Sequence, residues 1–323
     1  MPYWLPLLIV LTGVAGAILW RLKVQRLAIT HIDLRVPGLA QELDGFTIAH
    51  ISDLHLQMLR VRLADIESAV VAGEPDIVCM TGDLIARPAD LDPALRWLAR
   101  LGERYPVFVV RGNNEPELEE LQEALRRTPA PGVRWLTNEH AVVQHGGARL
   151  AVIGFDDPEK RRPDLLVATA GVESASFRLG LAHSPVAWPM LAAGYGFGKG
   201  IRAAPLHNRG RRVDLLLVGH THGGQVRFRG RDALMVHSAA AKALASGLFR
   251  LDATGPIPGM LPVLDHWTIL SASKNGEKLA ATWSSPMMLV SRGLGNATIP
   301  LRINCPPEVA FVRLRRAKEV DKH

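Results

Sequence analysis

The first apolar stretch of the chain differs from the later ones because it is longer and carries no charge. Residues 3–20 contain no Asp, Glu, Lys or Arg, and this length allows a helix to cross a bilayer. Tyr3, Trp4 and Trp20 lie at its two ends, where amphipathic rings prefer the headgroup region. A buried core helix would normally show a polar face, which is missing here. The pattern therefore predicts a transmembrane helix within an anchor domain at residues 1–26.

The charges beside this stretch predict its orientation. Arg21, Lys23 and Arg26 follow the apolar residues directly, whereas a cleaved secretory signal carries basic residues in front. Because basic flanks stay on the cytoplasmic side, we expect a single-pass protein of the inner membrane with a cytoplasmic body. The alternative is an atypical signal peptide followed by a periplasmic body.

Apolar runs then alternate with segments of helical periodicity. Strands are predicted at residues 28–36, 46–51, 76–80 and 107–110. The first helix between them has apolar positions at Leu63, Ile66 and Val70. The second begins with Asp92 as cap and Pro93 as first residue, and its apolar positions are Leu95, Leu98 and Leu101. A third helix has an acidic start and a basic end. This alternation predicts an α/β body.

The second half of the chain is richer in strand patterns. Gly146 and Gly147 separate two alternating segments and predict a hairpin. Two further apolar strands end at His183 and His220, and two more are expected within residues 287–314. The second half is therefore predicted to be mostly β.

One later segment interrupts this order of strands. Residues 252–286 include an apolar run that is too short to span a membrane and is broken by prolines. This segment is predicted either to pack on its own domain or to form an inserted lobe that contacts the membrane interface or an acyl chain.

Composition narrows the class of protein. The 323 residues are 48% apolar and 21% charged, so the chain can bury a large core and disorder is not expected. Two cysteines cannot form a disulfide framework. The net charge of +7 fits an anionic membrane surface or a phosphorylated substrate. Nucleic acid is not an expected partner, because the basic residues are scattered and lack interleaved aromatic residues.

Metal-ligating side chains follow five of the predicted strands. Since residues two apart on a strand face the same side, Asp53 with His55, and His220 with His222, could each direct two ligands at one site. Oxygen and imidazole ligands together suit manganese, iron or zinc. The complete set is Asp53, His55, Asp83, Asn113, His183, His220 and His222. Five other histidines are predicted to be structural: His50, His140, His207, His237 and His266.

The ordered series DLH, GDL, GNN, AHS and GHTHGG resembles the calcineurin-like metallophosphoesterases. The resemblance implies an α/β fold at residues 27–323, with two face-to-face β-sheets flanked by helices in four layers, and two divalent metal ions. One ion would be held by Asp53, His55, Asp83 and His222, and the other by Asp83, Asn113, His183 and His220. Two metal ions about 3.5–4 Å apart activate water for attack on phosphorus. No protein nucleophile is then needed.

The C-terminal motif SRGLGNATIPLRINCPPEV resembles the membrane-associated bacterial branch of this family. That branch contains phosphodiesterases and enzymes that cleave UDP-2,3-diacylglucosamine. Asn114 stands where the family usually has a catalytic histidine, and an amide donates a hydrogen bond but supplies no proton near neutral pH. This departure favours diester or pyrophosphate substrates over alkyl monoesters.

The sequence therefore predicts a dinuclear-metal phosphohydrolase acting on a phosphorylated, lipid-linked substrate at the membrane. UDP-2,3-diacylglucosamine is the specific expectation. The alternatives are a broad phosphodiesterase with a soluble substrate and a metal-binding scaffold that has lost catalysis along with the histidine.

Overall fold

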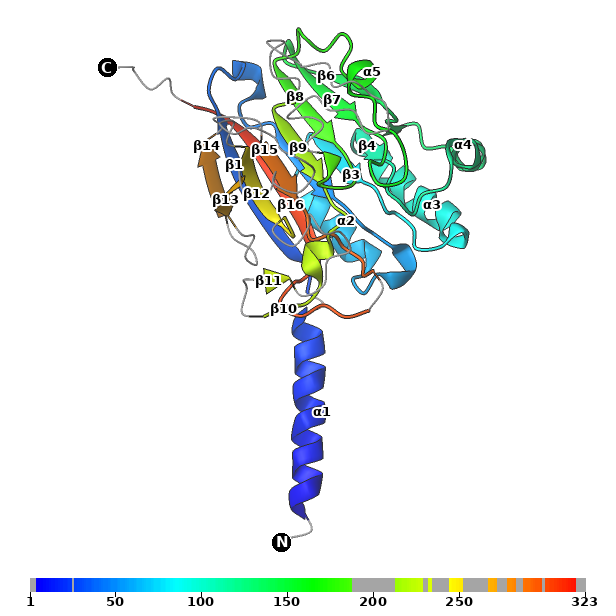
Figure 1. Cartoon of the computed structure of the whole chain (residues 1–323), viewed down its shortest axis with the longest axis vertical. Coiled ribbons are helices and arrows are strands. Elements are labelled where there is room, and N and C mark those ends of the chain that lie inside the picture. Colours follow the sequence, from blue (N-terminus) through cyan, green and yellow to red (C-terminus); the bar gives the residue numbers. More distant parts are fainter. Residues whose placement is uncertain are drawn as a thin grey trace, which may run out of the picture.

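A computed structural model of the chain describes residues 4–24, 26–187, 213–228, 232–233, 244–251, 267–271, 278–282, 287–297 and 300–317. Figure 1 shows a body made of two β-sheets and a separate N-terminal helix, α1 (Trp4–Val24). A helix is therefore present where a transmembrane helix was predicted. Large apolar side chains of α1, including Leu7, Ile9 and Val10, are exposed. Among the described residues, no helix has the length and hydropathy required of a membrane span.

The first sheet contains the strands that were predicted in the first half of the chain. Its order is β14-β1-β16-β2-β3-β4-β5, and β2, β3 and β4 are parallel neighbours. The bounds are β1 (Ala28–Val36), β2 (Thr47–Ile51), β3 (Ile77–Thr81), β4 (Val107–Val110), β5 (Val133–Trp135), β14 (Lys278–Thr282) and β16 (Glu308–Arg316).

The second sheet contains the hairpin and the strands that end in histidine. Its order is β13-β12-β15-β9-β8-β7-β6, and β8 and β9 are parallel neighbours. The bounds are β6 (Glu139–His145), β7 (Ala148–Gly154), β8 (Phe177–Leu181), β9 (Leu215–Val218), β12 (Gly247–Leu251), β13 (Trp267–Ser271) and β15 (Met287–Val290). A separate two-stranded ladder joins β10 (Arg227–Phe228) to β11 (Asp232–Ala233).

Strand alternation explains the layers. Along β3, Ile77 and Cys79 enter the core between the sheets, whereas Val78 and Met80 pack in the outer core that includes helical side chains. The helices are α2 (Leu63–Ala72), α3 (Leu91–Gly102), α4 (Leu118–Arg127) and α5 (Leu165–Ala168), with short 3₁₀ turns η1 (Gln41–Leu43), η2 (Leu56–Met58), η3 (Pro88–Asp90) and η4 (His222–Gly224). The predicted α/β class, with two sheets flanked by helices, is confirmed.

The predicted start of the second helix was two residues too late. α3 begins at Leu91, and Asp90 rather than Asp92 is the N-cap residue. The reason is that η3 leads directly into α3, so Asp90 already has right-handed helical backbone angles. Pro93 lies in the first turn, where a missing backbone N–H costs nothing. The predicted inner face of α3 is correct, since Leu95, Leu98 and Leu101 are buried.

The strands predicted within residues 287–314 are shorter than expected. β15 ends at Val290 and β16 begins only at Glu308. In the loop between them, the buried guanidinium of Arg302 donates to the backbone oxygens of Arg292, Gly295 and Cys305. These carbonyls are thereby satisfied without a strand partner. Within the predicted insert at 252–286, β13 pairs with β12 at the edge of the second sheet, and β14 pairs with β1 at the edge of the first. Residues 252–266, 272–277 and 283–286 lie outside the described part.

Candidate metal centre

The predicted ligands come from loops that follow neighbouring strands. Asp53 and His55 follow β2, Asp83 follows β3, and Asn113 follows β4 in the first sheet. In the second sheet, one ligand loop follows β8 and another follows β9, and they carry His183, His220 and His222. Because parallel neighbours end at the same edge of a sheet, the packed sheets bring these loops together. All seven predicted ligands therefore meet at one place.

The predicted convergence of the ligands is present, but its predicted cause was wrong, because the paired ligands do not alternate along strands. β2 and β9 end before the ligands, which lie on loops with left-handed backbone: φ is 50° at Asp53, 38° at His55, 54° at Asp83, 69° at His220 and 50° at His222. Residues other than glycine rarely adopt this backbone region. Such residues cluster at functional sites, where the surrounding structure holds them.

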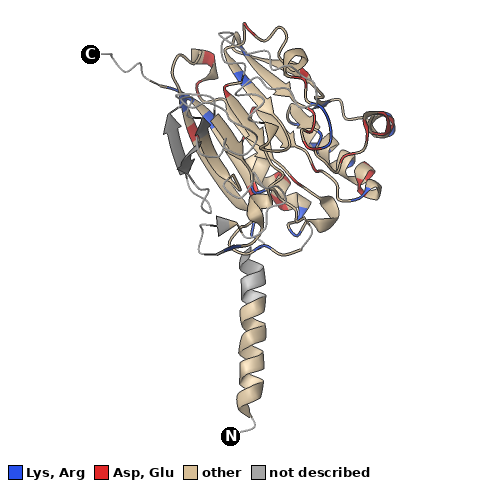
Figure 2. Ribbon diagram, viewed as in Figure 1, with Lys and Arg blue, Asp and Glu red and all other residues tan. Residues whose placement is uncertain are grey.

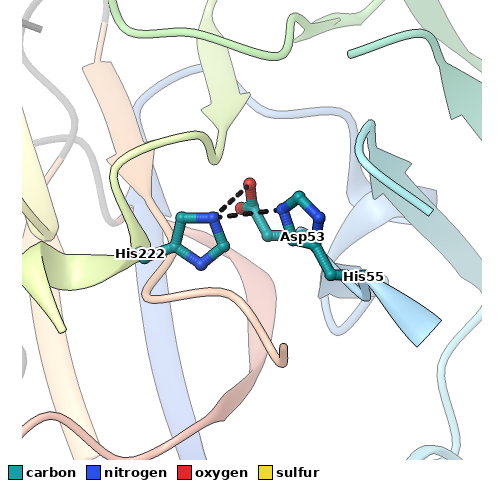
Figure 3. Close-up of side chains that lie close together, drawn as sticks. All are labelled: Asp53, His55 and His222. Atoms are coloured by element: carbon teal, nitrogen blue, oxygen red, sulfur yellow. Dashed lines mark hydrogen bonds and ion pairs between the residues drawn. The ribbon is translucent and has the colours of Figure 1, made fainter. Parts of the chain in front are cut away.

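The first subsite comprises Asp53, His55 and His222 (Figure 3). The Nε2 atoms of His55 and His222 lie 3.2 Å apart, and Nε2 of His222 lies 3.6 Å from Oδ1 of Asp53. All three side chains are buried. The ligand atoms therefore point inward to one small volume.

The second subsite comprises Asn113, His183 and His220. Oδ1 of Asn113 lies 2.9 Å from Nε2 of His183 and 3.0 Å from Nδ1 of His220, and these two nitrogens are 3.1 Å apart. Asp83 connects the subsites, because its Oδ2 lies 3.2 Å from Nε2 of His55 and 3.5 Å from Nε2 of His183. Asp53 also has a ligand atom within 4.8 Å of those of Asp83 and His183. Which residue binds which ion stays a prediction.

The hydrogen bond on the far side of the His183 ring shows which of its nitrogens faces the site. Nδ1 of His183 lies 2.9 Å from the Thr81 carbonyl, whereas Nδ1 of His222 lies 3.3 Å from the Gly295 carbonyl and 3.5 Å from a guanidinium nitrogen of Arg302. A carbonyl only accepts, so Nδ1 of His183 carries a proton, and Nε2 of both rings faces the carboxylates. Buried acceptors that face one another in this way fit divalent cations of the borderline class.

The electrostatics of the buried groups support this fit. Burial opposes a charge on His183, but Asp83 and Asp53 outweigh it and raise the pKa of His183 to about 9. Burial alone would raise the pKa of Asp83, yet His183 and His55 hold that pKa well below its ordinary value. Burial also raises the pKa of Asp53 and lowers that of His222. In the metal-free protein, a proton on His183 thus compensates part of the carboxylate charge.

Asn114 lies at the wall of the same site. Its side-chain Nδ2 donates to Oδ2 of Asp83 over 2.7 Å, and its backbone N–H donates to Oδ1 over 2.9 Å. Both contacts orient the carboxylate that connects the two subsites. The predicted catalytic role of Asn114 toward a leaving group stays a prediction.

Sequence reasoning missed a buried carboxylate that orders two ligand loops. Glu115 accepts backbone N–H groups from Asp83, Leu84 and Gly112, and it is almost fully buried. It ties the loop after β3 to the loop after β4. Its place directly after GNN was the available signal.

A cavity of about 440 Å³ opens onto the ligands. Besides ligand side chains and Asn114, it is lined by Met58, Ala86, Asn296 and Ala297. The wall therefore combines apolar surface with neutral amides. A phosphoric ester placed at the two subsites would contact both.

Two of the histidines set apart as structural are described. Nε2 of His50 lies 2.8 Å from Oγ1 of Thr81, and burial lowers the pKa of His50 to about 4. Nδ1 of His140 lies 3.1 Å from the Ala168 carbonyl. Each ring thus has a hydrogen-bond partner within the fold that is not one of the predicted ligands. The predictions for three others, His207, His237 and His266, lie outside the described residues.

The two-sheet α/β body and its clusters of carboxylate, amide and imidazole side chains fit the class of metal-dependent hydrolases. Residues 46–224 match the family profile described as calcineurin-like phosphoesterase, which is more than half of the chain. The chain belongs to the calcineurin-like phosphoesterase family.

Three relatives illustrate the match. The chain is 27% identical over 186 residues to the uncharacterized metallophosphoesterase YkoQ of Bacillus subtilis, covering 56% of this chain and 62% of that protein. It is 26% identical over 215 residues to a transmembrane protein with metallophosphoesterase domain from Bos taurus, covering 62% and 45%. It is 25% identical over 282 residues to phosphodiesterase YaeI of Escherichia coli, covering 83% and 82%. Family and relatives support a metal-dependent phosphoric ester hydrolase.

Proposed function

We propose that the chain uses two divalent metal ions to hydrolyse a phosphodiester or pyrophosphate bond. The observation that carries this proposal is the convergence of seven buried or nearly buried ligands around Asp83. Asp53, His55 and His222 would hold one ion, and Asn113, His183 and His220 the other, with Asp83 shared. Two ions held there would supply positive charge for the phosphoryl oxygens and an activated water. Manganese, iron and zinc all suit these ligands.

The cavity wall supports a diester or pyrophosphate over an alkyl monoester. Among the described residues, no Lys or Arg side chain lines the cavity, so none of these residues would balance the second charge of a monoester dianion. Asn114 can hold an oxygen through a hydrogen bond, but it cannot protonate a leaving alkoxide. General acid catalysis is worth about a hundredfold to ten thousandfold. A phosphate leaving group suffers least from its absence.

The finer proposal is an amphiphilic substrate at the membrane, with UDP-2,3-diacylglucosamine as the specific candidate. It is supported by the exposed apolar side chains of α1, by residues 4–17 of that helix, which are drawn without a charged residue (Figure 2), and by Met58, Ala86 and Ala297 at the cavity wall. The bovine relative is named a transmembrane protein. A C-terminal reporter active only in the cytoplasm would agree with the basic flank Arg21, Lys23 and Arg26, and a periplasmic signal would contradict this orientation.

The test compares three substrates with the full chain in mild detergent and manganese. We expect hydrolysis of bis(p-nitrophenyl) phosphate and of UDP-2,3-diacylglucosamine, and about a hundredfold less activity toward an alkyl phosphomonoester. Metal-chelated protein and the variant Asp83→Asn are the controls. Preferential hydrolysis of the monoester would contradict the proposed substrate class.

The main alternative is a phosphodiesterase of broad specificity with soluble substrates. It is favoured by the similarity to phosphodiesterase YaeI over most of both chains. The two proposals differ in one result: the broad enzyme cleaves the small diester as efficiently as the lipid-linked pyrophosphate. A chain that binds two ions and hydrolyses none of the substrates would instead fit the scaffold alternative.

A further inference from the structure

The segment from Asp156 to Arg161 follows β7 of the second sheet and contacts the loop that follows β4 of the first. Lys160 Nζ donates to the carbonyl of Asn113 over 2.7 Å. The guanidinium of Arg161 donates to the carbonyls of Gly112, over 2.8 Å, and Glu115, over 2.7 Å. The segment thus holds the backbone around one ligand of the second subsite.

Asp157 gives this segment its shape. Its carboxylate accepts the backbone N–H groups of Glu159, over 3.2 Å, and Lys160, over 3.0 Å, and it is fully buried. This local turn directs Glu159 toward the ends of β8 and β9. The segment therefore reaches both sheets from one turn.

Glu159 contacts the other side of the second subsite. Its Oε1 accepts a hydrogen bond from Oγ of Ser184, the residue after His183, over 2.8 Å. The same oxygen lies 3.3 Å from Nε2 of His220. Nδ1 of His220 faces Asn113 and His183, so Glu159 stands at the nitrogen on the far side of the ring.

The ring of His183 provides the comparison. Its nitrogen away from the site lies against the Thr81 carbonyl, which places a proton there and leaves Nε2 facing inward. At His220, the group on that side is the carboxylate of Glu159, at ion-pair distance from Nε2. A carboxylate in this position also increases the basicity of the ligating nitrogen.

We propose that Glu159 is a positioning residue for the second metal subsite, holding His220 with its proton on Nε2 and its lone pair on Nδ1. A role in stability alone explains the placement less well. The side chain of Glu159 is 28% exposed, and ion pairs that are partly exposed contribute little to folding. The inference rests on the proposed metal site but on no particular substrate.

The test measures the ring and the metal separately in the full chain. Nitrogen NMR of the metal-free protein, labelled at histidine, reports the tautomer of His220, and calorimetric titration with manganese reports the two binding steps. In Glu159→Ala we expect mixed tautomers at His220 and a dissociation constant about 10–100-fold larger for the ion at the second subsite. The dissociation constant of the ion at the first subsite should stay within about twofold of the wild type. Glu159→Gln should retain part of the effect, because its amide oxygen still accepts from Nε2.

Two controls make the result specific. Glu173→Ala removes an exposed glutamate in the turn before β8 and should change neither reading. Ser184→Ala removes the other partner of Glu159 and should leave the tautomer of His220 in place. An unchanged tautomer and unchanged second-ion affinity in Glu159→Ala would overturn the proposal, as would equal weakening of both ions. If the protein binds two ions as described and hydrolyses nothing, the proposed function fails while this inference stands.

Discussion

The two metal subsites are built in different ways. In the first, all three ligands, Asp53, His55 and His222, have left-handed backbone, and closely packed glycines surround them. In the second, only His220 among its own three ligands has such a backbone. Its geometry depends instead on side chains from the segment Asp156–Arg161. A steric change should therefore weaken ion binding at the first subsite, whereas removal of side-chain contacts should weaken ion binding step by step at the second.

The largest expected effect comes from the residue that both subsites share. Asp83→Asn removes the charge that faces His55 and His183, so both ions should be lost and turnover should fall about a thousandfold or more, since each ion contributes several kcal/mol. Metal analysis and diester hydrolysis measure this together. Asp65→Asn, which removes a carboxylate from the exposed pair with Arg62, is the matched control and should behave as the wild type. Full turnover of Asp83→Asn would contradict a shared carboxylate.

A steric change should break the first subsite selectively. A Cβ at Gly219 would overlap Oγ of Ser52 and Oδ2 of Asp53. We expect Gly219→Ala to weaken the first ion more than the second and to lower the free energy of unfolding by about 1–3 kcal/mol, as overpacking does. Calorimetric titration and denaturant unfolding measure the two effects. Gly16→Ala, in open space on α1, should change neither. Equal weakening of both ions would mean that the subsites are not built independently.

The contrast also separates what sequence reasoning could find from what it could not. The ligands were predictable because each follows an apolar strand, and parallel strands collect their ends at one edge. Glu159, Lys160 and Arg161 resemble ordinary solvated loop residues in the sequence. Their role depends on contacts with residues more than twenty positions away, such as Ser184, Gly112 and Asn113. No local pattern contains that information.

Boundaries were less predictable for a related reason. The end of β15 depends on Arg302, whose side chain takes the carbonyls that a longer strand would use. Likewise, the left-handed angles at Asp53 and His55 follow from packing of the loops, since neither residue type requires them. Propensity therefore predicted which elements exist, and long-range contacts determined where they end.

The pH dependence of ion binding at the second subsite provides a further test of the difference between the subsites. The pKa of His183 is raised from 6.5 to about 9, so its contribution to metal-free stability is fully present below pH 6.5 and is lost as the pH rises through about 9. Binding at the second subsite must displace this proton. Between pH 9 and 6.5 we expect its affinity to fall about tenfold for each unit of acidification, since one proton is released. Titration in buffers of different ionisation enthalpy counts that proton, and a count of zero would contradict the assignment of His183.

The smallest effect is expected at the cavity wall. Asn114→His restores a titratable donor beside Asp83, and hydrolysis of an alkyl monoester should rise by about tenfold, because general acid catalysis helps poor leaving groups most. Pyrophosphate hydrolysis should change by about twofold at most, since a phosphate leaves without that help. Asn114→Gln controls for the change in size. An equal change on both substrates would show that this position does not face the leaving group.

The central claim is that one centre holds two ions around Asp83. Anomalous X-ray diffraction from crystals of the full chain grown with manganese tests it most directly. Two peaks are expected, separated by about 3.5–4 Å, one beside Asp53, His55 and His222 and the other beside Asn113, His183 and His220. A single peak, or two peaks with Asp83 in contact with neither, would contradict it.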